Sequence, residues 1–141
     1  MLKNFFKKKE EKDPNNKNVL IIALLIHAAK IDENYTEDEK KIIKKTIMEL
    51  NKISSNQADE LLKIAEKKEE ESNQIVEFTK EIKKYPMEFK LKIIEIIWKI
   101  VYSDGTSDNY ESNLIRRICG LLYISDKDNG IIKTNVKNLL K

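Results

Sequence analysis

Two stretches of the chain, VLIIALLIHAA at residues 19–29 and LKIIEIIWKIV at residues 91–101, decide its fold class. The first is apolar on nearly every side, and the second is interrupted only by Lys92, Glu95 and Lys99. A helix that is hydrophobic all round belongs in the centre of a domain. We therefore expect these two stretches to form buried helices in the middle of the protein.

The composition around these stretches favours one all-α domain. The chain has 141 residues, of which 40% are hydrophobic and 36% are charged, proportions that suit a single compact domain. Only 3 Gly and 2 Pro are present, too few for the turns of a β-sandwich, barrel or propeller. Helix start signals recur along the chain and predict about seven helices. These signals are Lys17 or Asn18, Thr36 with Glu39, Ser54 with Gln57, Ser72, Pro86, Asp108 with Glu111, and Ser125 with Asp128.

The chain contains an internal repeat, in which the shift that places Asp32 on Asp104 also superimposes the two apolar stretches. Under this repeat shift Glu39 falls on Glu111, and an apolar pair and a basic pair come next in both copies. The offset is larger than that of solenoid repeats. We therefore expect two pseudo-symmetric halves that close into a compact bundle.

Each half carries an acidic loop, and the two loops supply candidate metal ligands. The carboxylates in question belong to Asp32, Glu39, Asp104, Asp108 and Glu111. Ligand sets made only of oxygen select hard cations, so that Ca²⁺ or Mg²⁺ is expected rather than zinc or copper. The spacing is not that of an EF-hand, and any such site is expected to be weak.

The same residues have a purely structural alternative. Glu39 and Glu111 occupy the third position of capping boxes, and acidic residues stabilise the first turn of a helix without any ligand. Arg116 and Arg117 are the only two arginines of the chain. Arginine forms a planar bidentate pair with a carboxylate, so that one of the two is expected to bind an acidic residue of this loop or of its twin.

Residues 97–118, IWKIVYSDGTSDNYESNLIRRI, resemble the second signature of the TerB family. That family covers the tellurite-resistance protein TerB and the N-terminal domain of the DjlA co-chaperone, and its pattern is roughly W-x-x-A-x-A-D-G-x-x-x-x-x-E-x-x-x-I-R-R. Residues 28–39 resemble the first signature, although Glu33 stands where the family usually has Gly. The resemblance covers about residues 18–126.

The resemblance implies a seven-helix bundle in a bacterial protein that is cytoplasmic or associated with the inner face of the membrane. It also implies acidic loops that bind a divalent cation, links to stress resistance and multiprotein assemblies, and no established enzymatic activity. We therefore expect a non-enzymatic interaction module with a protein partner. A chaperone-associated regulatory domain like that of DjlA is the alternative, and a metal-dependent hydrolase is a remote one.

Residues 1–17 form a basic tail ahead of the domain at residues 18–141. Residues 1–18 hold six Lys against three acidic residues, and the rest of the chain is electrically balanced. Because nucleic-acid binding needs a basic stripe, no nucleic-acid partner is expected. Leu2, Phe5 and Phe6 share one helical face next to three lysines. Residues 1–9 could therefore form a weak peripheral membrane contact, or a solvated tail.

Two single residues of reactive type complete the candidates. The chain has 1 His and 1 Cys, which excludes multi-histidine centres and cysteine-based zinc sites and leaves an enzyme few catalytic groups. We expect His27 to lie in the core or at its rim, satisfied by a carbonyl. Cys119 is expected to be an inert packed thiol.

Overall fold

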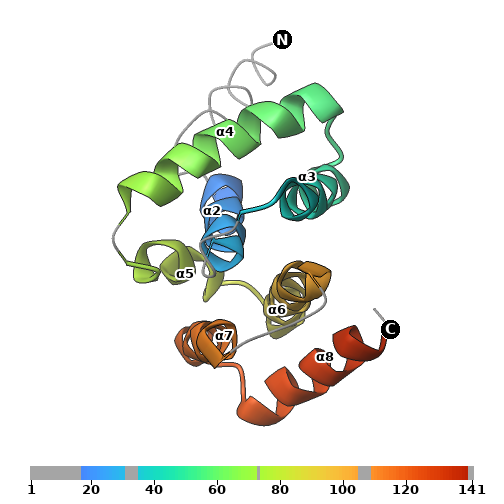
Figure 1. Cartoon of the computed structure of the whole chain (residues 1–141). Coiled ribbons are helices and arrows are strands. Elements are labelled where there is room, and N and C mark those ends of the chain that lie inside the picture. Colours follow the sequence, from blue (N-terminus) through green and yellow to red (C-terminus); the bar gives the residue numbers. More distant parts are fainter. Residues whose placement is uncertain (1–16, 31–34, 73, 105–108, 140–141) are drawn as a thin grey trace.

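The computed structural model describes residues 17–30, 35–72, 74–104 and 109–139, and these residues form seven α-helices, one short 3-10 helix and no β-strand (Figure 1). The prediction of an all-α domain with seven helices is confirmed. The helices are α2 (Lys17–Ala29), α3 (Glu37–Asn51), α4 (Ser55–Glu71), α5 (Val76–Ile82), α6 (Met87–Val101), η1 (Tyr102–Asp104), α7 (Asn109–Leu121) and α8 (Asp126–Leu139).

Helices α2 and α6 form the centre of the fold, as their all-round hydrophobicity predicts. From Val19 to Ala29, every residue of α2 except His27 is buried. Helix α2 packs against α3, α4, α5 and α6, and Figure 1 shows it enclosed by its neighbours. Helix α6 buries Trp98, whose indole Nε1 donates a hydrogen bond of 2.9 Å to Asn129 Oδ1 on α8. A buried indole needs such a partner, so that this bond ties α8 to the centre.

The capping signals of the sequence are confirmed where the structure describes them. The Thr36 side chain accepts a hydrogen bond from the backbone N–H of Glu39, and Ser54 does the same for Gln57, both in complete capping boxes. At the start of α8, Ser125 Oγ accepts from the N–H of Asp128 at 3.1 Å. These bonds satisfy N–H groups that have no partner within the first turn.

Two predicted helix starts need correction. Ser72 does not begin α5 but ends α4, because its backbone is extended and its hydroxyl donates to the carbonyl of Lys68 at 2.8 Å. This bond satisfies a carbonyl of the last helical turn. Helix α5 begins only at Val76, and its N-cap residue makes no side-chain capping bond. Pro86 does mark the start of α6, but it lies one residue before the first helical position at which proline is tolerated, as the N-cap.

The repeat in the sequence is also a repeat in the helix bounds. Under the repeat shift, the end of α2 at Ala29 falls on the end of α6 at Val101, and the start of α3 at Glu37 falls on the start of α7 at Asn109. The packing follows the same plan, because α2, α3 and α4 contact one another as α6, α7 and α8 do. A pseudo-twofold axis between the halves stays a prediction.

Helix α5 joins the halves and belongs to neither three-helix unit. It packs against α2 and α7 and buries Phe78, Thr79 and Ile82 on its inner face. One helix between the halves therefore covers the side of the central pair on which α7 lies.

Candidate functional site

The predicted carboxylate site falls largely outside the described residues. Asp32 and Asp108 lie in segments that the structure does not describe. The backbone of Asp104 ends η1 and that of Glu111 lies in the first turns of α7, but their side chains are likewise outside the description. The assembly of these four carboxylates into one site therefore stays a prediction.

Glu39 is the one predicted ligand whose side chain is described, and it serves the helix cap. The residue is 6% exposed. Its Oε1 accepts a hydrogen bond of 3.0 Å from the backbone N–H of Thr36 and one of 2.9 Å from the Thr36 hydroxyl. The structural alternative for this carboxylate is confirmed, because at least one of its oxygens is already engaged at the start of α3.

The two arginines lie on the exposed side of α7. Neither Arg116 nor Arg117 forms an ion pair with any residue of the described ranges. The carboxylates of the neighbouring loop lie outside those ranges, so that the expected arginine–carboxylate pair stays a prediction.

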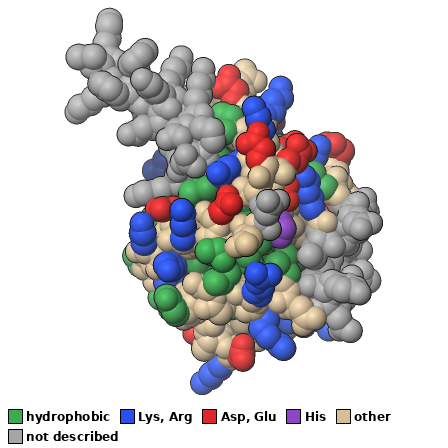
Figure 2. All heavy atoms as spheres, turned by 90° about the vertical axis from the view of Figure 1, so that its left-hand side faces the viewer, with side chains coloured by type: hydrophobic (Ala, Val, Ile, Leu, Met, Phe, Trp, Pro, Cys, Tyr) green, Lys and Arg blue, Asp and Glu red, His purple; other side chains and the backbone are tan. Residues whose placement is uncertain are grey.

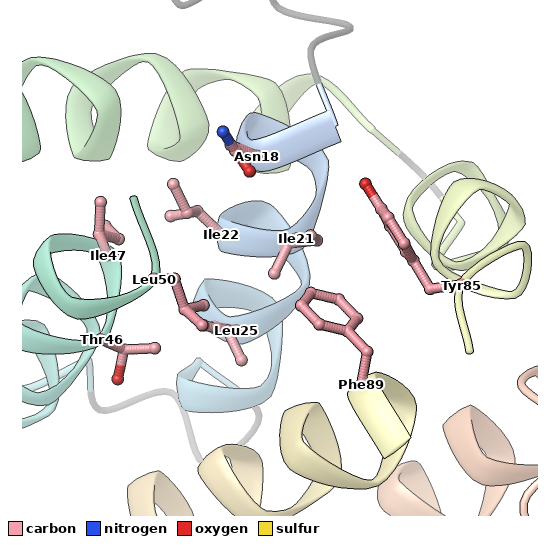
Figure 3. Close-up of a pocket in the computed structure, with 9 residues that line it drawn as sticks. All are labelled: Asn18, Ile21, Ile22, Leu25, Thr46, Ile47, Leu50, Tyr85 and Phe89. Carbon is pink, nitrogen blue, oxygen red and sulfur yellow. The ribbon is translucent and has the colours of Figure 1, made fainter. Parts of the chain in front are cut away.

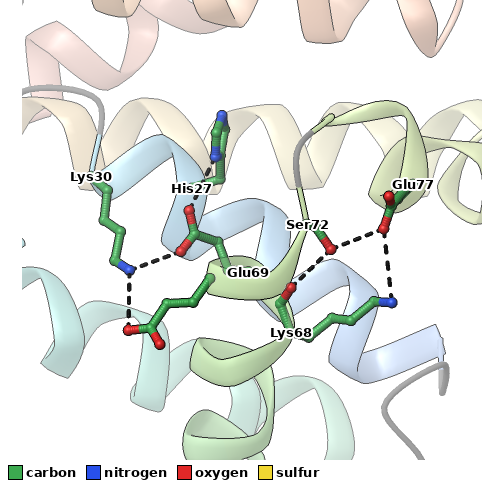
Figure 4. A network of polar contacts seen from close by, with 7 residues as sticks. His27, Lys30, Lys68, Glu69, Ser72 and Glu77 are labelled. Carbon is green, nitrogen blue, oxygen red and sulfur yellow. Dashed lines mark hydrogen bonds and ion pairs between the residues drawn. The ribbon is translucent and has the colours of Figure 1, made fainter.

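The chain around the first acidic loop is held by an ionic network that joins α2 to α4 (Figure 4). Glu69 on α4 receives Lys30 Nζ at 2.8 Å on one carboxylate oxygen and His27 Nδ1 at 3.2 Å on the other. The Glu69 side chain is only 10% exposed, and a buried carboxylate needs such partners. The network therefore fastens the end of α2 where the chain enters the loop.

His27 lies at the rim of the core, as expected, but its partner differs from the predicted one. The imidazole is 35% exposed and meets the Glu69 carboxylate in place of a backbone carbonyl. Its ring also lies 6.4 Å from that of Phe78 on α5. His27 therefore connects α2 to both α4 and α5.

A second arm of the same network joins α4 to α5. Glu77 accepts a hydrogen bond of 2.9 Å from the Ser72 hydroxyl and lies 3.8 Å from Lys68 Nζ. Figure 4 shows the two arms side by side at the end of α4. On the face seen in Figure 2, acidic and basic side chains gather around the single histidine, with an apolar area beside them.

Tyr35 lies between two lysines just after the first acidic loop. Lys40 Nζ is 4.9 Å and Lys30 Nζ 5.9 Å from the centre of its ring, within the range of a cation–π contact. The Tyr35 hydroxyl is buried. Burial, and then the charge of nearby Glu66, raise the pKa of this hydroxyl well above its ordinary value.

Sequence reasoning missed this network, although a signal for it exists. His27 and Lys30 stand one turn apart at the end of a buried helix, and residues 69–71 are three consecutive glutamates. The spacing along one helix is visible in the sequence, but the pairing joins residues that lie far apart in the chain. It therefore depends on how α2 and α4 cross.

Metal-ligating side chains do not gather elsewhere in the described ranges, where no group of three His, Cys, Asp or Glu residues could hold an ion. Cys119 is buried, and burial together with Asp126 raises the pKa of its thiol to about 12. The prediction of an unreactive packed thiol agrees with this environment, because the thiolate is the nucleophilic form.

The tail and its membrane contact, predicted for residues 1–9, lie outside the described residues. Within the described part of the chain, no helix is both long and apolar enough to cross a membrane.

Comparison with known proteins identifies one family. The family model described as "Tellurite resistance protein TerB" matches residues 18–134, which include both acidic loops and most of the seven helices. No curated protein and no solved structure matches the chain.

Proposed function

This chain belongs to the TerB family, and from that premise we propose that it is a protein-interaction module without catalytic activity of its own. The observation that carries the proposal is the family match, which extends from the start of α2 into α8. The partner that we propose is another protein, in a bacterial stress-response setting inside the cell.

We further propose that a divalent cation controls this interaction through the acidic loops. Asp32 of the first loop and Asp104, Asp108 and Glu111 of the second are the ligands in this proposal. Glu39 contributes less, because its Oε1 already serves the cap of α3. Carboxylate oxygens suit Ca²⁺ or Mg²⁺, and the Glu69 network supports the proposal by holding the start of the first loop.

Calorimetric titration of the full chain with CaCl₂ and with MgCl₂ tests the cation. We expect binding with a Kd of about 10⁻⁴–10⁻³ M, the range of weak calcium modules, and a loss of the heat in Asp104→Asn. The matched control is Asp126→Asn, because Asp126 is an exposed acid in the first turn of α8. Absence of heat from the unmodified chain contradicts the cation proposal.

Affinity capture tests the interaction separately. The full chain is immobilised and exposed to a bacterial lysate with CaCl₂ or with EDTA, and bound proteins are identified by mass spectrometry. We expect a defined partner that is lost with EDTA and in Asp104→Asn but kept in Asp126→Asn. A partner that binds equally in all four cases supports the module and contradicts its control by a cation; no specific partner in any case contradicts the module itself.

A further inference from the structure

A groove runs between α3 and α6. Its volume is about 820 Å³, within the range of binding clefts. Its floor includes four apolar side chains that are only partly buried, Ile42, Leu50, Leu91 and Ile132. Because removal of apolar surface from water is favourable, this floor favours the binding of a second surface over the groove.

A smaller pocket continues the apolar surface at the start of α6. It shares Thr46 and Leu50 with the groove and has a volume of about 140 Å³. Figure 3 shows the pocket between α2, α3 and the start of α6, with Phe89 and Tyr85 on one side. The apolar surface that a partner can cover therefore extends beyond the groove itself.

The exposed side of α6 along the groove carries one stripe of charged residues. In chain order they are Glu88, Lys92, Glu95 and Lys99. The geometry of an α-helix places these four positions within about 60° of one another around the axis. Glu95 and Lys99 pair at 3.3 Å, whereas neither Glu88 nor Lys92 has an ion-pair partner among the residues that the structure describes. We call these four residues the α6 stripe.

The balance of charge along the groove restricts the kind of partner that fits it. Lys45 and Glu49 on α3 add one charge of each sign to the α6 stripe. A strongly acidic or strongly basic partner therefore meets like charges as often as opposite ones, and like charges at an interface weaken binding. The groove instead suits a partner whose charges alternate in sign, as those of α6 do.

The α6 stripe is complementary to a second copy of itself when the two helices run antiparallel. The midpoint between Lys92 and Glu95 is also the midpoint between Glu88 and Lys99. The inner two residues lie about 2 Å from this midpoint along the helix axis, and the outer two about 8 Å from it. A twofold axis at the midpoint therefore places Lys92 of one copy opposite Glu95 of the other, and Glu88 opposite Lys99. A parallel arrangement places like charges opposite each other.

We propose that two copies of this chain bind each other, with the α6 stripe of each copy lying antiparallel over the groove between α3 and α6 of the other. Both copies then use the same surface, as in the common twofold dimers, and such a surface must be complementary to itself. Ion pairs between the copies replace the Glu95–Lys99 pair within α6 and also engage Glu88 and Lys92. Because exposed ion pairs contribute little and are screened by salt, the dimer is weak and dissociates more readily as salt is added. This dimer does not depend on the proposed cation.

Charge reversal followed by sedimentation velocity tests the dimer. The full chain is measured at concentrations up to about 1 mM, so that a Kd as weak as about 1 mM is detected. Lys92→Glu places acidic side chains opposite each other on both sides of the twofold axis, and Glu95→Lys places basic ones there. Each single variant is expected to associate at least about tenfold more weakly than the unmodified chain. The double variant Lys92→Glu/Glu95→Lys is expected to regain the association.

A mixture of the two single variants distinguishes this interface from a general loss of structure. In a mixed pair, each acidic side chain at positions 92 and 95 of one copy lies opposite a basic one of the other. The mixture is therefore expected to form a dimer, although each variant alone associates weakly. Circular dichroism of each variant verifies that it is folded.

Two residues on α4 provide matched controls. Glu60 and Lys63 are exposed, have the same spacing as Lys92 and Glu95, and do not line the groove. Glu60→Lys and Lys63→Glu are therefore expected to associate as the unmodified chain does. Association that is unchanged in Lys92→Glu and Glu95→Lys, or that the mixture does not regain, overturns the proposal.

Dilution of the isotope-enriched, unmodified chain provides a measurement that needs no substitution. The amide signals along α3 and α6 are expected to shift with concentration, and those of α4 are expected to stay in place. A chain that remains monomeric up to about 1 mM, or whose concentration-dependent shifts lie away from α3 and α6, overturns the proposal and leaves the groove to a different partner.

Discussion

The two sides of the central helix pair differ in how they are closed. On the α2–α7 side, α5 packs down and buries Phe78 to 1% exposure. On the α3–α6 side there is a groove lined by both apolar and charged residues. Among the described residues, the repeat in the helix bounds therefore does not extend to the packing on the two sides of the central pair. Charged side chains line the side that has the groove, whereas α5 buries apolar side chains on the other side.

The equivalent residues His27 and Lys99 show this difference on a small scale. His27 bonds across to Glu69 on α4 and lies near Phe78 on α5. Lys99 pairs at 3.3 Å with Glu95, one turn before it on the same helix. The His27–Glu69 contact joins two helices. The Lys99–Glu95 pair lies within α6 and joins it to no other helix.

The largest loss of stability is expected when the buried Phe78 side chain of α5 is removed. Phe78→Ala is expected to lower the free energy of unfolding by about 3–5 kcal/mol, because it leaves a cavity between α5 and α2. The matched change on the groove side is Phe89→Ala, which is expected to cost less, about 1–3 kcal/mol, because the Phe89 side chain is only half-buried. Urea denaturation followed by circular dichroism measures both variants, and equal losses contradict the difference between the two sides of the central pair.

Replacement of two glutamates compares the cross-helix contact with the local one. Glu69→Gln is expected to cost about 1–3 kcal/mol, because it removes the charge from a buried carboxylate that holds two partners. Glu95→Gln is expected to cost under about 0.5 kcal/mol, since the Lys99 pair is an exposed contact within one helix. Thermal unfolding in low salt measures the two variants, and a larger loss for Glu95→Gln contradicts this order.

The fold could be predicted from the sequence because its signals are local. The apolar stretches give α2 and α6, and the caps at Thr36, Ser54 and Ser125 place three helix starts. Ser72 misleads because a serine hydroxyl can also donate to the last carbonyls of a helix, as it does here. Sequence alone cannot distinguish these two uses.

The candidate site could be predicted only as a set of residue types. Carboxylates on two loops suggest oxygen ligands, but Glu39 shows that such a carboxylate can be engaged in a cap. The Glu69 network and the groove arise from helix packing. Both the network and the groove are formed by residues on different helices, so that the sequence pattern of a single helix cannot predict them.

Cys119 and its equivalent in the first half, Ile47, are both buried, but only Cys119 can lose a proton. Measurements of stability at alkaline pH therefore test this difference between the halves. The pKa of the Cys119 thiol is raised from 9.0 to about 12 in the folded chain. Above pH 9 the unfolded chain releases this proton and the folded chain keeps it, so that stability falls as the pH rises. We expect this loss to reach about 1.4 kcal/mol at pH 10.

Cys119→Ala is expected to remove that part of the slope, as measured by urea unfolding at pH 8 and pH 10. The pKa values of Tyr35 and Tyr85 are also raised by burial, so that a slope of the same sign remains at higher pH. An unchanged slope in Cys119→Ala contradicts the assignment to the thiol.

A small gain in stability is expected in α8, the less well-packed equivalent of α4. Helix α4 buries Ala58, Leu61, Leu62 and Ala65, while α8 buries only Val136 and carries Gly130 in its interior. A Cβ at Gly130 meets no atom within 4 Å, so that Gly130→Ala adds no clash and reduces the freedom of the unfolded chain. We expect a gain of about 0.5–1 kcal/mol, measured as a higher urea midpoint with an unchanged slope. A loss of stability would mean that α8 needs the glycine for a contact beyond the described residues, and the two helices would then differ in more than packing.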